Sequence, residues 1–307
     1  MLSGDVLHRF HVTGPLARGG MGELWLADDE QHRRVVLKTV RDDLVNDDEV
    51  RRCFRREIAV VSRVRHAHIV HHVAHGVESG VDVLALEHIE GASLATLRHR
   101  TPLPLAAALC VADDVARALA HVHGIADAHG TPLGLVHGDV SPQNIIVDAR
   151  GHALLIDFGG VTWRGADVTP GTLIGKPGYV SPEQLEGREL DGRSDLYALG
   201  VVLWEMITGQ TLFASDDLRR DRPVPPPSRY ARVPDLIDAT VMRMVASERE
   251  ARFPSAAEAA ELIESAALLH GIDGGRQWLG ARAAASEGEV DLTRTPVITT
   301  SSARTLR

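Results

Sequence analysis

Three oxygen-bearing side chains, Asp139, Asn144 and Asp157, occur close together in the stretch HGDVSPQNIIVDARGHALLIDFGG. Two apolar runs in it, 145–147 and 153–156, are joined by the turn residues DARGH and predict a β-hairpin. Because the runs are similar in length, Asn144 and Asp157 should return to the same open end, where an amide and a carboxylate suit Mg²⁺ beside phosphates. Asp139 belongs to the same end and could orient or deprotonate a hydroxyl group. A polar hairpin mouth with ordinary Asx turns is the alternative, but it leaves the FG after Asp157 unexplained.

Two features of the first 60 residues could bind an anion. The stretch LARGGMGELWLA contains Gly19, Gly20 and Gly22, which allow the backbone to approach a phosphate closely, although a plain glycine turn would look the same. Lys38 ends the apolar run VVLK; it is either an edge lysine reaching for solvent or a lysine held for an anion. A lysine held for an anion needs a carboxylate to fix its position, and Glu57 on a predicted helix is the candidate. The alternative is a solvated Glu57, as most helix glutamates are.

The elements that must position these residues differ between the two parts of the chain. The first third alternates short β-branched runs with turns, interrupted by one segment, Asn46 to Arg65, with the apolar spacing of a helix. Beyond about Ala92 the pattern is helical, and a helix is expected between Pro104 and Gly124. Its apolar stripe would consist of Ala108, Ala112, Val115, Leu119 and Val122. Further helices are expected at Asp195 to Thr208, Pro234 to Ser247 and Ser255 to His270. The fold class expected is α+β, with a mainly β front part and a mainly α rear part.

Composition limits the class of protein. The 307 residues are 44% apolar and 24% charged, as in a folded globular protein, and the net charge of −9 gives no reason to expect nucleic acid or an anionic membrane as partner. Cys53 and Cys110 lie far apart, which makes a disulfide framework improbable. The amino terminus lacks a signal-peptide core, and the longest apolar run, Leu196 to Trp204, is too short to span a bilayer. We expect a cytoplasmic protein without a membrane segment.

At these residues the chain resembles the eukaryotic-like (Hanks-type) serine/threonine protein kinases of bacteria. The resemblance implies the two-lobed protein kinase fold, with a small, mainly β N-lobe containing one helix and a larger, mainly α C-lobe. The implied organisation is a lead-in at 1–9 and a kinase domain at 10–270. From about Gly271 the chain loses periodicity and becomes Ser/Thr-rich, which predicts a mobile tail at 271–307. Within the domain, the N-lobe would cover about 10–86, the hinge about 87–91 and the C-lobe about 92–270.

The resemblance also assigns roles to individual residues. Asp139 would be the catalytic base, Asn144 and Asp157 would hold Mg²⁺, and Lys38 would contact the α- and β-phosphates of ATP while pairing with Glu57. Leu86 would be the gatekeeper. The full set of implied nucleotide contacts is Leu16, Gly19, Gly20, Gly22, Leu24, Val36, Lys38, Glu57, Leu86, Glu87, Ile89 and Ile146, with the backbone of Glu87 and Ile89 meeting adenine.

Two rear motifs are similar to structural parts of the same family. In YVSPEQ, Glu183 would pair with Arg252 of EARFPS. In RSDLYALG, Asp195 would steady the catalytic loop.

The chain departs from the family pattern at Gly138, where many relatives have an arginine that receives a phosphorylated activation-loop residue. Phosphorylation of a threonine in that loop would lose its bidentate partner. Activity should therefore depend little on such a switch. The candidate threonines are Thr162, Thr169 and Thr172.

The more serious departure is Ser141, because the family has a lysine there that neutralises charge on the transferring phosphoryl group. In LIGKPGYVSPEQ, Lys176 occupies the place of a family threonine that touches the catalytic aspartate and that lysine. Our hypothesis is that the two side-chain types have changed places, so that Lys176 and Ser141 are both catalytic residues. The alternative is a solvent-facing Lys176 in a weak or inactive kinase.

The function that follows from the resemblance is ATP- and Mg²⁺-dependent transfer of the γ-phosphoryl group to Ser or Thr hydroxyls of protein substrates in signalling. A pseudokinase or nucleotide-binding scaffold is a second hypothesis, suggested by Ser141, Gly138 and Ala17. A small-molecule kinase of the aminoglycoside or choline type is a third, which the YVSPEQ and RSDLYALG motifs disfavour. A regulatory partner is possible, but nothing in the sequence identifies it.

Overall fold

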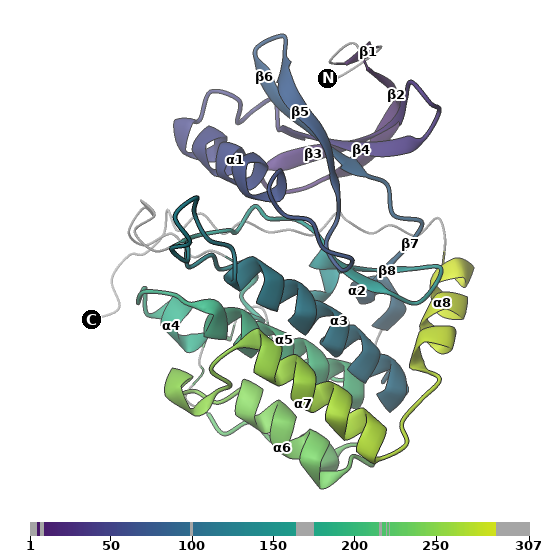
Figure 1. The fold of residues 1–307 in the computed structure, drawn as a ribbon, viewed down its shortest axis with the longest axis vertical. Coiled ribbons are helices and arrows are strands. Elements are labelled where there is room, and N and C mark those ends of the chain that lie inside the picture. Colours follow the sequence, from purple (N-terminus) through teal and green to yellow (C-terminus); the bar gives the residue numbers. More distant parts are fainter. Residues whose placement is uncertain are drawn as a thin grey trace. The chain divides into compact units, whose positions relative to one another are not determined.

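The structure, a computed structural model, describes residues 5–6, 9–98, 101–163, 175–214, 217–218, 220 and 222–286. The chain divides into two compact units (Figure 1). Within the described residues, the first unit draws on Met1–His99, Pro142–Val161 and Arg276–Thr295, and the second on Arg100–Ser141, Thr162–Gly275 and Pro296–Arg307. Among the described residues, no helix combines the length and the apolar character needed to cross a membrane.

The first unit is built on a six-stranded antiparallel sheet with the strand order β1-β2-β3-β4-β6-β5. The strands are β1 (Asp5–Val6), β2 (Phe10–Arg18), β3 (Gly22–Asp29), β4 (Arg34–Val40), β5 (His72–Glu78) and β6 (Val81–Glu87). One face of this sheet forms a core that includes Phe10, Trp25, Leu37 and Val83. Because side chains alternate along a strand, the residues between them, such as Lys38, belong to the other face.

Helix α1 (Asp48–Val61) connects β4 to β5, where the sequence predicted the one helix of this region. Asp47 caps it by accepting hydrogen bonds from the backbone N–H groups of Glu49 and Val50. Its buried face contains Phe54 and Ile58 together with the charged Glu57. A buried carboxylate on this face needs a cationic partner.

The predicted hairpin is present as β8 (Ile145–Asp148) and β9 (Ala153–Leu155), which pair antiparallel and extend a small sheet begun by β7 (Gly91–Ser93). A one-turn 3₁₀ helix, Pro142–Asn144, precedes β8, and the short helix α2 (Leu94–Arg98) follows β7. Only glycine fits at position 91, because an added Cβ would overlap the carbonyl oxygen of Val147. These strand pairs place residues 142–161 in the first unit, whereas the predicted C-lobe begins at about 92.

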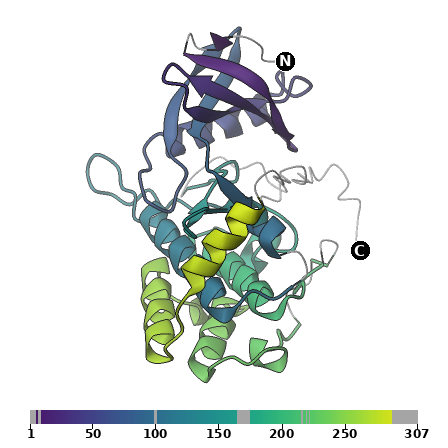
Figure 2. The same ribbon diagram turned by 90° about the vertical axis from the view of Figure 1, so that its right-hand side faces the viewer.

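The second unit is helical. Its helices are α3 (Leu105–His123), α4 (Pro182–Leu185), α5 (Gly192–Thr208), α6 (Asp235–Met244) and α7 (Ala256–Leu269), with one-turn 3₁₀ helices at Pro227–Arg229 and Arg249–Ala251. Helix α3 packs against α5 and α7 (Figures 1 and 2). All five stripe residues are fully buried: Ala108, Ala112, Val115, Leu119 and Val122. Helix α5 is the centre of the unit, since every residue from 194 to 208 is buried.

The prediction of a mobile tail from residue 271 is wrong for its first part, because Gly275–Ala285 forms helix α8, drawn in yellow in Figure 2. Leu279 and Ala283 are fully buried, and an added Cβ on Gly280 would lie 2.6 Å from the carbonyl oxygen of Ala149 in the β8–β9 turn. The segment GRQWLGARAAA has few large apolar residues, so its buried stripe gives little periodic signal. Residues 287–307 lie outside the described part.

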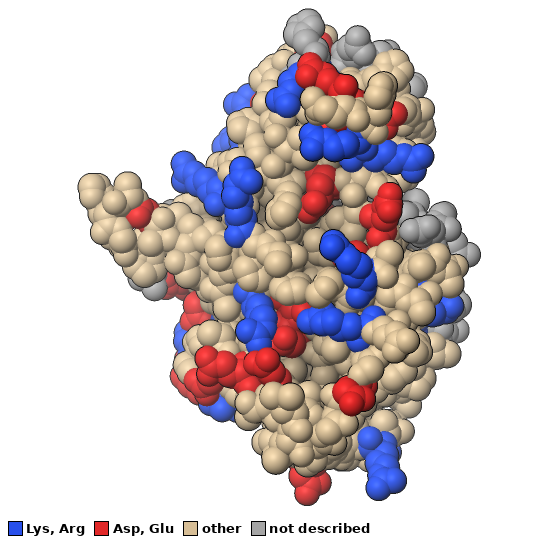
Figure 3. Space-filling view, turned by 45° about the vertical axis from the view of Figure 1, so that its right-hand side comes forward, with Lys and Arg blue, Asp and Glu red and all other residues tan. Residues whose placement is uncertain are grey.

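Charge is mixed on the surface drawn in Figure 3, where Lys and Arg side chains alternate with Asp and Glu side chains. Among the described residues of that face, no broad area carries charge of one sign.

Candidate active site

In the first unit, Lys38 lies between two carboxylates. Its Nζ is 2.6 Å from Oε1 of Glu57 and 2.8 Å from Oδ1 of Asp157. Strand β4 supplies the lysine, the buried face of α1 supplies Glu57, and Asp157 follows β9. The expected Lys38–Glu57 ion pair is therefore present, and the side chain of Lys38 is only 13% exposed.

The surroundings of Lys38 keep it charged. Burial by itself would lower the pKa of Lys38, but the charges and hydrogen bonds of Asp157 and Glu57 outweigh burial and raise that pKa above its ordinary value. An ammonium fixed in this way is suited to binding phosphate oxygens.

Asn144 and Asp157 both lie at the open end of the hairpin, as the sequence predicted. The N–H of Ile156 donates to the carbonyl oxygen of Asn144 at 2.9 Å, next to the Ile145–Leu155 strand pair. Asp157 has a positive φ of 63°, and its Oδ1 also accepts a hydrogen bond from the N–H of Gly159 at 3.1 Å. An amide and a carboxylate oxygen are hard ligands, so the donor set fits Mg²⁺.

Three of the predicted nucleotide-binding residues, Leu24, Val36 and Leu86, share one face of the main sheet with Lys38. Leu24 lies opposite Lys38 in the β3–β4 pair, and Val36 lies opposite Leu86 in the β4–β6 pair. The N–H of Glu87 donates to the carbonyl oxygen of His71 at 2.9 Å. Four predicted contacts are half-buried apolar side chains, namely Leu16, Leu24, Ile89 and Ile146. Half-buried apolar side chains suit the face of a nucleobase.

In the second unit, Asp139 is held by a lysine. The Nζ of Lys176 is 3.0 Å from Oδ2 of Asp139 and 3.0 Å from Oγ of Ser141, and its backbone N–H donates to Oδ1 of Asp139 at 3.1 Å. Lys176 is 6% exposed and Ser141 is fully buried. The solvent-facing lysine of the alternative reading is thus contradicted. The two residues expected to have exchanged roles contact each other, and Lys176 also contacts Asp139.

The backbone before Asp139 is fixed by Asp195. Its carboxylate accepts hydrogen bonds from the N–H groups of His137 and Gly138, each at 2.8 Å, as the sequence predicted. Sequence reasoning missed two further contacts: His123 hydrogen-bonds Asp195 at 2.8 Å, and the side-chain amide of Gln184 donates to the carbonyl oxygen of Gly138 at 3.0 Å. Gln184 belongs to the YVSPEQ motif, but nothing in the spacing pointed to its partner.

The backbone conformation explains why position 138 is a glycine. Its φ is 78°, and an added Cβ on Gly175, itself at φ 100°, would lie 2.6 Å from the carbonyl oxygen of Gly138. An arginine at 138 would be strained in this backbone conformation. The glycine thus both fits the loop and removes a phosphate-binding side chain.

The predicted Glu183–Arg252 pair is present and completely buried. The carboxylate of Glu183 accepts from Nη1 of Arg252 at 2.6 Å and from Nη2 at 2.9 Å, and from Oγ of Ser194 at 2.6 Å. The guanidinium also lies 4.8 Å from the centre of the Tyr197 ring. This fork joins α4 to the segment before α7.

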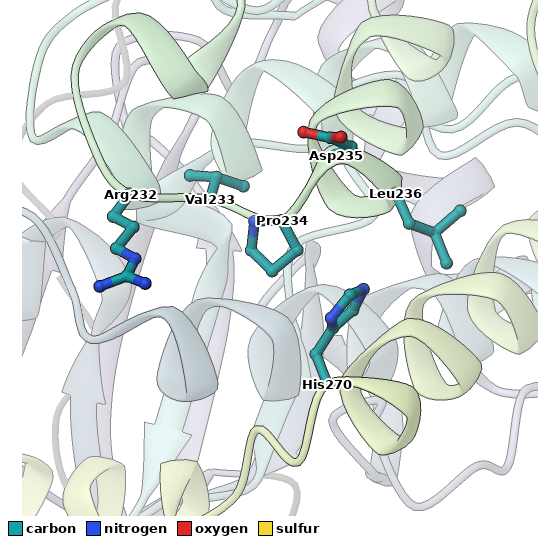
Figure 4. A pocket seen from close by; sticks show the side chains of 6 residues that line it. All are labelled: Arg232, Val233, Pro234, Asp235, Leu236 and His270. Carbon is teal, nitrogen blue, oxygen red and sulfur yellow. The ribbon is translucent and has the colours of Figure 1, made fainter.

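A surface groove elsewhere in the second unit does not bring charged side chains together as the sites around Lys38 and Asp139 do. It is lined by Arg232, Val233, Pro234, Asp235, Leu236 and His270 (Figure 4). Figure 4 shows the ends of Arg232, Asp235 and His270 apart from one another rather than converging on one point.

Comparison with known proteins agrees with this geometry. The protein kinase domain family matches residues 10–232. Tyrosine-protein kinase MasK of Myxococcus xanthus is 31% identical over 87% of this chain and 44% of its own length, and serine/threonine-protein kinase PknB of Mycobacterium leprae is 34% identical over 81% and 42%. The crystal structure of the Mycobacterium tuberculosis PknI kinase domain is 28% identical, with a TM-score of 0.68 over 87% of this chain and 99% of that one.

The chain spans less than half the length of these curated relatives. The family match nevertheless covers most of the chain, in agreement with the α+β architecture and the order of the motifs. The chain therefore belongs to the protein kinase family and has the protein kinase fold.

Proposed function

We propose that this chain is an ATP- and Mg²⁺-dependent kinase that transfers the γ-phosphoryl group to serine or threonine hydroxyls of protein substrates. The observation that carries the proposal is the fixed position of Lys38 between Glu57 and Asp157. A scaffold that only needed its shape would have no use for a charged lysine held in this way.

In the proposed reaction, Lys38 binds the α- and β-phosphates of ATP, and the face bearing Leu24 and Val36 covers adenine. Asn144 and Asp157 would hold Mg²⁺, which supplies positive charge to the phosphates when bound. Asp139 orients the acceptor hydroxyl and takes its proton as the oxygen attacks the γ-phosphorus. The bond from the γ-phosphorus to the bridging oxygen breaks, and ADP leaves.

Lys176 supplies the positive charge that the family's lysine would provide at position 141, where this chain has serine. Its ammonium lies 3.0 Å from Asp139, the residue that contacts the acceptor hydroxyl in this mechanism. Negative charge on the transferring phosphoryl group would therefore develop beside a fixed positive charge in a buried setting, where electrostatic stabilisation is strong. Ser141 orients the ammonium through the contact of 3.0 Å.

The test is transfer of label from γ-labelled ATP by the purified chain with Mg²⁺, a general protein acceptor and a panel of small hydroxyl compounds. We expect label on protein serine or threonine with the wild type and none with Asp139→Asn, which keeps the shape of the side chain but cannot take a proton. Label on tyrosine, as the name of MasK suggests for that relative, would change the acceptor class. Equal labelling by both proteins, or none, would refute the proposal.

Activation-loop phosphorylation should matter little. Alanine at Thr162, Thr169 and Thr172 together is expected to leave kcat within about twofold, because no guanidinium at Gly138 can receive a phosphate. Thr162 is 7% exposed and exchanges backbone hydrogen bonds with Val136, whereas Thr169 and Thr172 lie outside the described residues. The check is kcat of phosphatase-treated wild type and variant; a collapse in the variant would contradict the expectation.

A further inference from the structure

Arg41 contacts the glycine turn between β2 and β3, although the sequence gave it no role. It follows β4 by one residue, three positions after Lys38. Its Nη1 donates to the carbonyl oxygens of Gly20 at 3.0 Å and Gly19 at 3.4 Å, and its backbone N–H donates to the carbonyl oxygen of Met21 at 3.1 Å. Three successive carbonyl groups thus turn toward one residue.

The geometry of the peptide bond determines where the N–H groups of the glycine turn point. In a trans peptide, the N–H of a residue points opposite to the carbonyl group of the residue before it. Because the carbonyl groups of Gly19, Gly20 and Met21 face Arg41, the N–H groups of Gly20, Met21 and Gly22 face away from it. Successive N–H groups that face one way form a concave site for an anion.

The turn is also next to the phosphate-binding lysine. An added Cβ on Gly22 would lie 3.5 Å from Cε of Lys38 and 3.0 Å from the carbonyl oxygen of Thr39. Gly22 therefore packs over the stem of Lys38, and the two anion-binding features belong to one place on the first unit.

A carboxylate fixes the direction of Arg41. Nε and Nη2 of Arg41 donate to the two oxygens of Asp43 at 2.9 and 2.6 Å, which leaves Nη1 for the glycine turn. Both partners are partly exposed, so the pair itself should add little to stability. Its effect is to direct a planar group that lysine cannot reproduce.

We propose that Arg41 is a positioning residue for the nucleotide: it holds the glycine turn with its N–H groups directed at the phosphates of ATP, without touching ATP itself. This inference rests on the proposed function, since ATP is the nucleotide that the turn would receive.

The test compares Arg41→Gln and Arg41→Lys with Arg33→Gln. Arg33 forms a similar pair with Asp29 at the other end of β3 and β4, at 2.8 Å and 2.7 Å, and its side chain is 72% exposed. Affinities for ATP and adenosine are measured by calorimetry, KM and kcat by label transfer, and hydrogen exchange of residues 19–22 in the nucleotide-free proteins.

With Arg41→Gln, we expect ATP affinity to fall about tenfold and KM for ATP to rise similarly, with adenosine affinity and kcat changed less than about twofold. Hydrogen exchange at residues 19–22 should be faster in Arg41→Gln than in the wild type. Arg41→Lys should recover little of the lost ATP affinity. Arg33→Gln should match the wild type in every measurement. Unchanged ATP affinity in Arg41→Gln, or an equal loss for adenosine, would overturn the inference while leaving the proposed kinase intact. A wild type that binds no ATP would overturn both.

Discussion

Lys176→Ala is expected to lower kcat about a hundredfold while KM for ATP changes less than about threefold. The ammonium of Lys176 contacts Asp139, which is proposed to act on the acceptor hydroxyl, and Ser141, which orients the ammonium, whereas the proposed ATP contacts belong to Lys38 and the main sheet. Removing it should therefore weaken interactions made in the transition state more than those made with bound ATP. Initial rates of label transfer at varied ATP concentrations give both constants.

The exchange of roles predicts a rescue. Adding Ser141→Lys to Lys176→Ala should recover part of the lost kcat, because the new ammonium can occupy the space that the old one leaves beside Asp139. Arg188→Ala is the matched control, since this cation lies nearby in sequence but its side chain is 47% exposed and paired with Glu186. Unchanged turnover in Lys176→Ala would refute the catalytic role, and increased turnover would mean that the Lys176–Asp139 pair restrains the base.

Glu183→Gln should have the largest effect on stability, lowering the free energy of unfolding by about 3–5 kcal/mol at pH 7. The substitution leaves the guanidinium of Arg252 without its anion in a place where both side chains are 0% exposed. Glu186→Gln is the matched control, because Glu186 ends the same short helix and pairs with Arg188 at 2.6 Å on the surface. That change should cost less than about 1 kcal/mol. Urea unfolding of the three proteins measures the difference.

The effect of Glu183 should depend on pH in a defined direction. Burial alone would raise the pKa of Glu183, but hydrogen bonds from Arg252 and Ser194 outweigh it and hold that pKa below its ordinary value of 4.5. The unfolded chain therefore binds this proton at a higher pH than the folded one, so the stability from Glu183 is present above pH 4.5 and is lost as pH falls through the folded pKa. The difference in free energy of unfolding between wild type and Glu183→Gln should therefore become smaller below pH 4.5. A gap that is independent of pH, or no larger than that of Glu186→Gln, would contradict the prediction.

Local patterns were sufficient for several parts of the site. The hairpin was predictable because apolar runs of similar length around a turn have essentially one register, and that register puts Asn144 beside Asp157. The stripe of α3 was predictable because helical spacing and burial agree along its length. The Lys38–Glu57 pair was one of two alternatives in the sequence: a buried lysine requires an anion, and the only helix predicted nearby carried one.

Other parts had no local signal. Helix α8 buries Leu279, Gly280 and Ala283, and small residues carry little hydrophobic periodicity even where close backbone contact favours them. Arg41 lies in a charged stretch like many others, and the role proposed for it depends on the direction of three carbonyl groups, which residue types do not determine.

By itself, the sequence determined which chemical groups this protein has and in which order: a lysine on a strand, a glutamate on a helix, a hairpin with an amide and a carboxylate at its mouth, and an aspartate before it. Order and periodicity sufficed because each depends on neighbours a few residues away. Only the tertiary structure decided that Lys176 contacts Ser141 across 35 positions of sequence and also contacts Asp139. That contact depends on the path of the loops between them, which is set by long-range packing and by glycines with positive φ at 138 and 175.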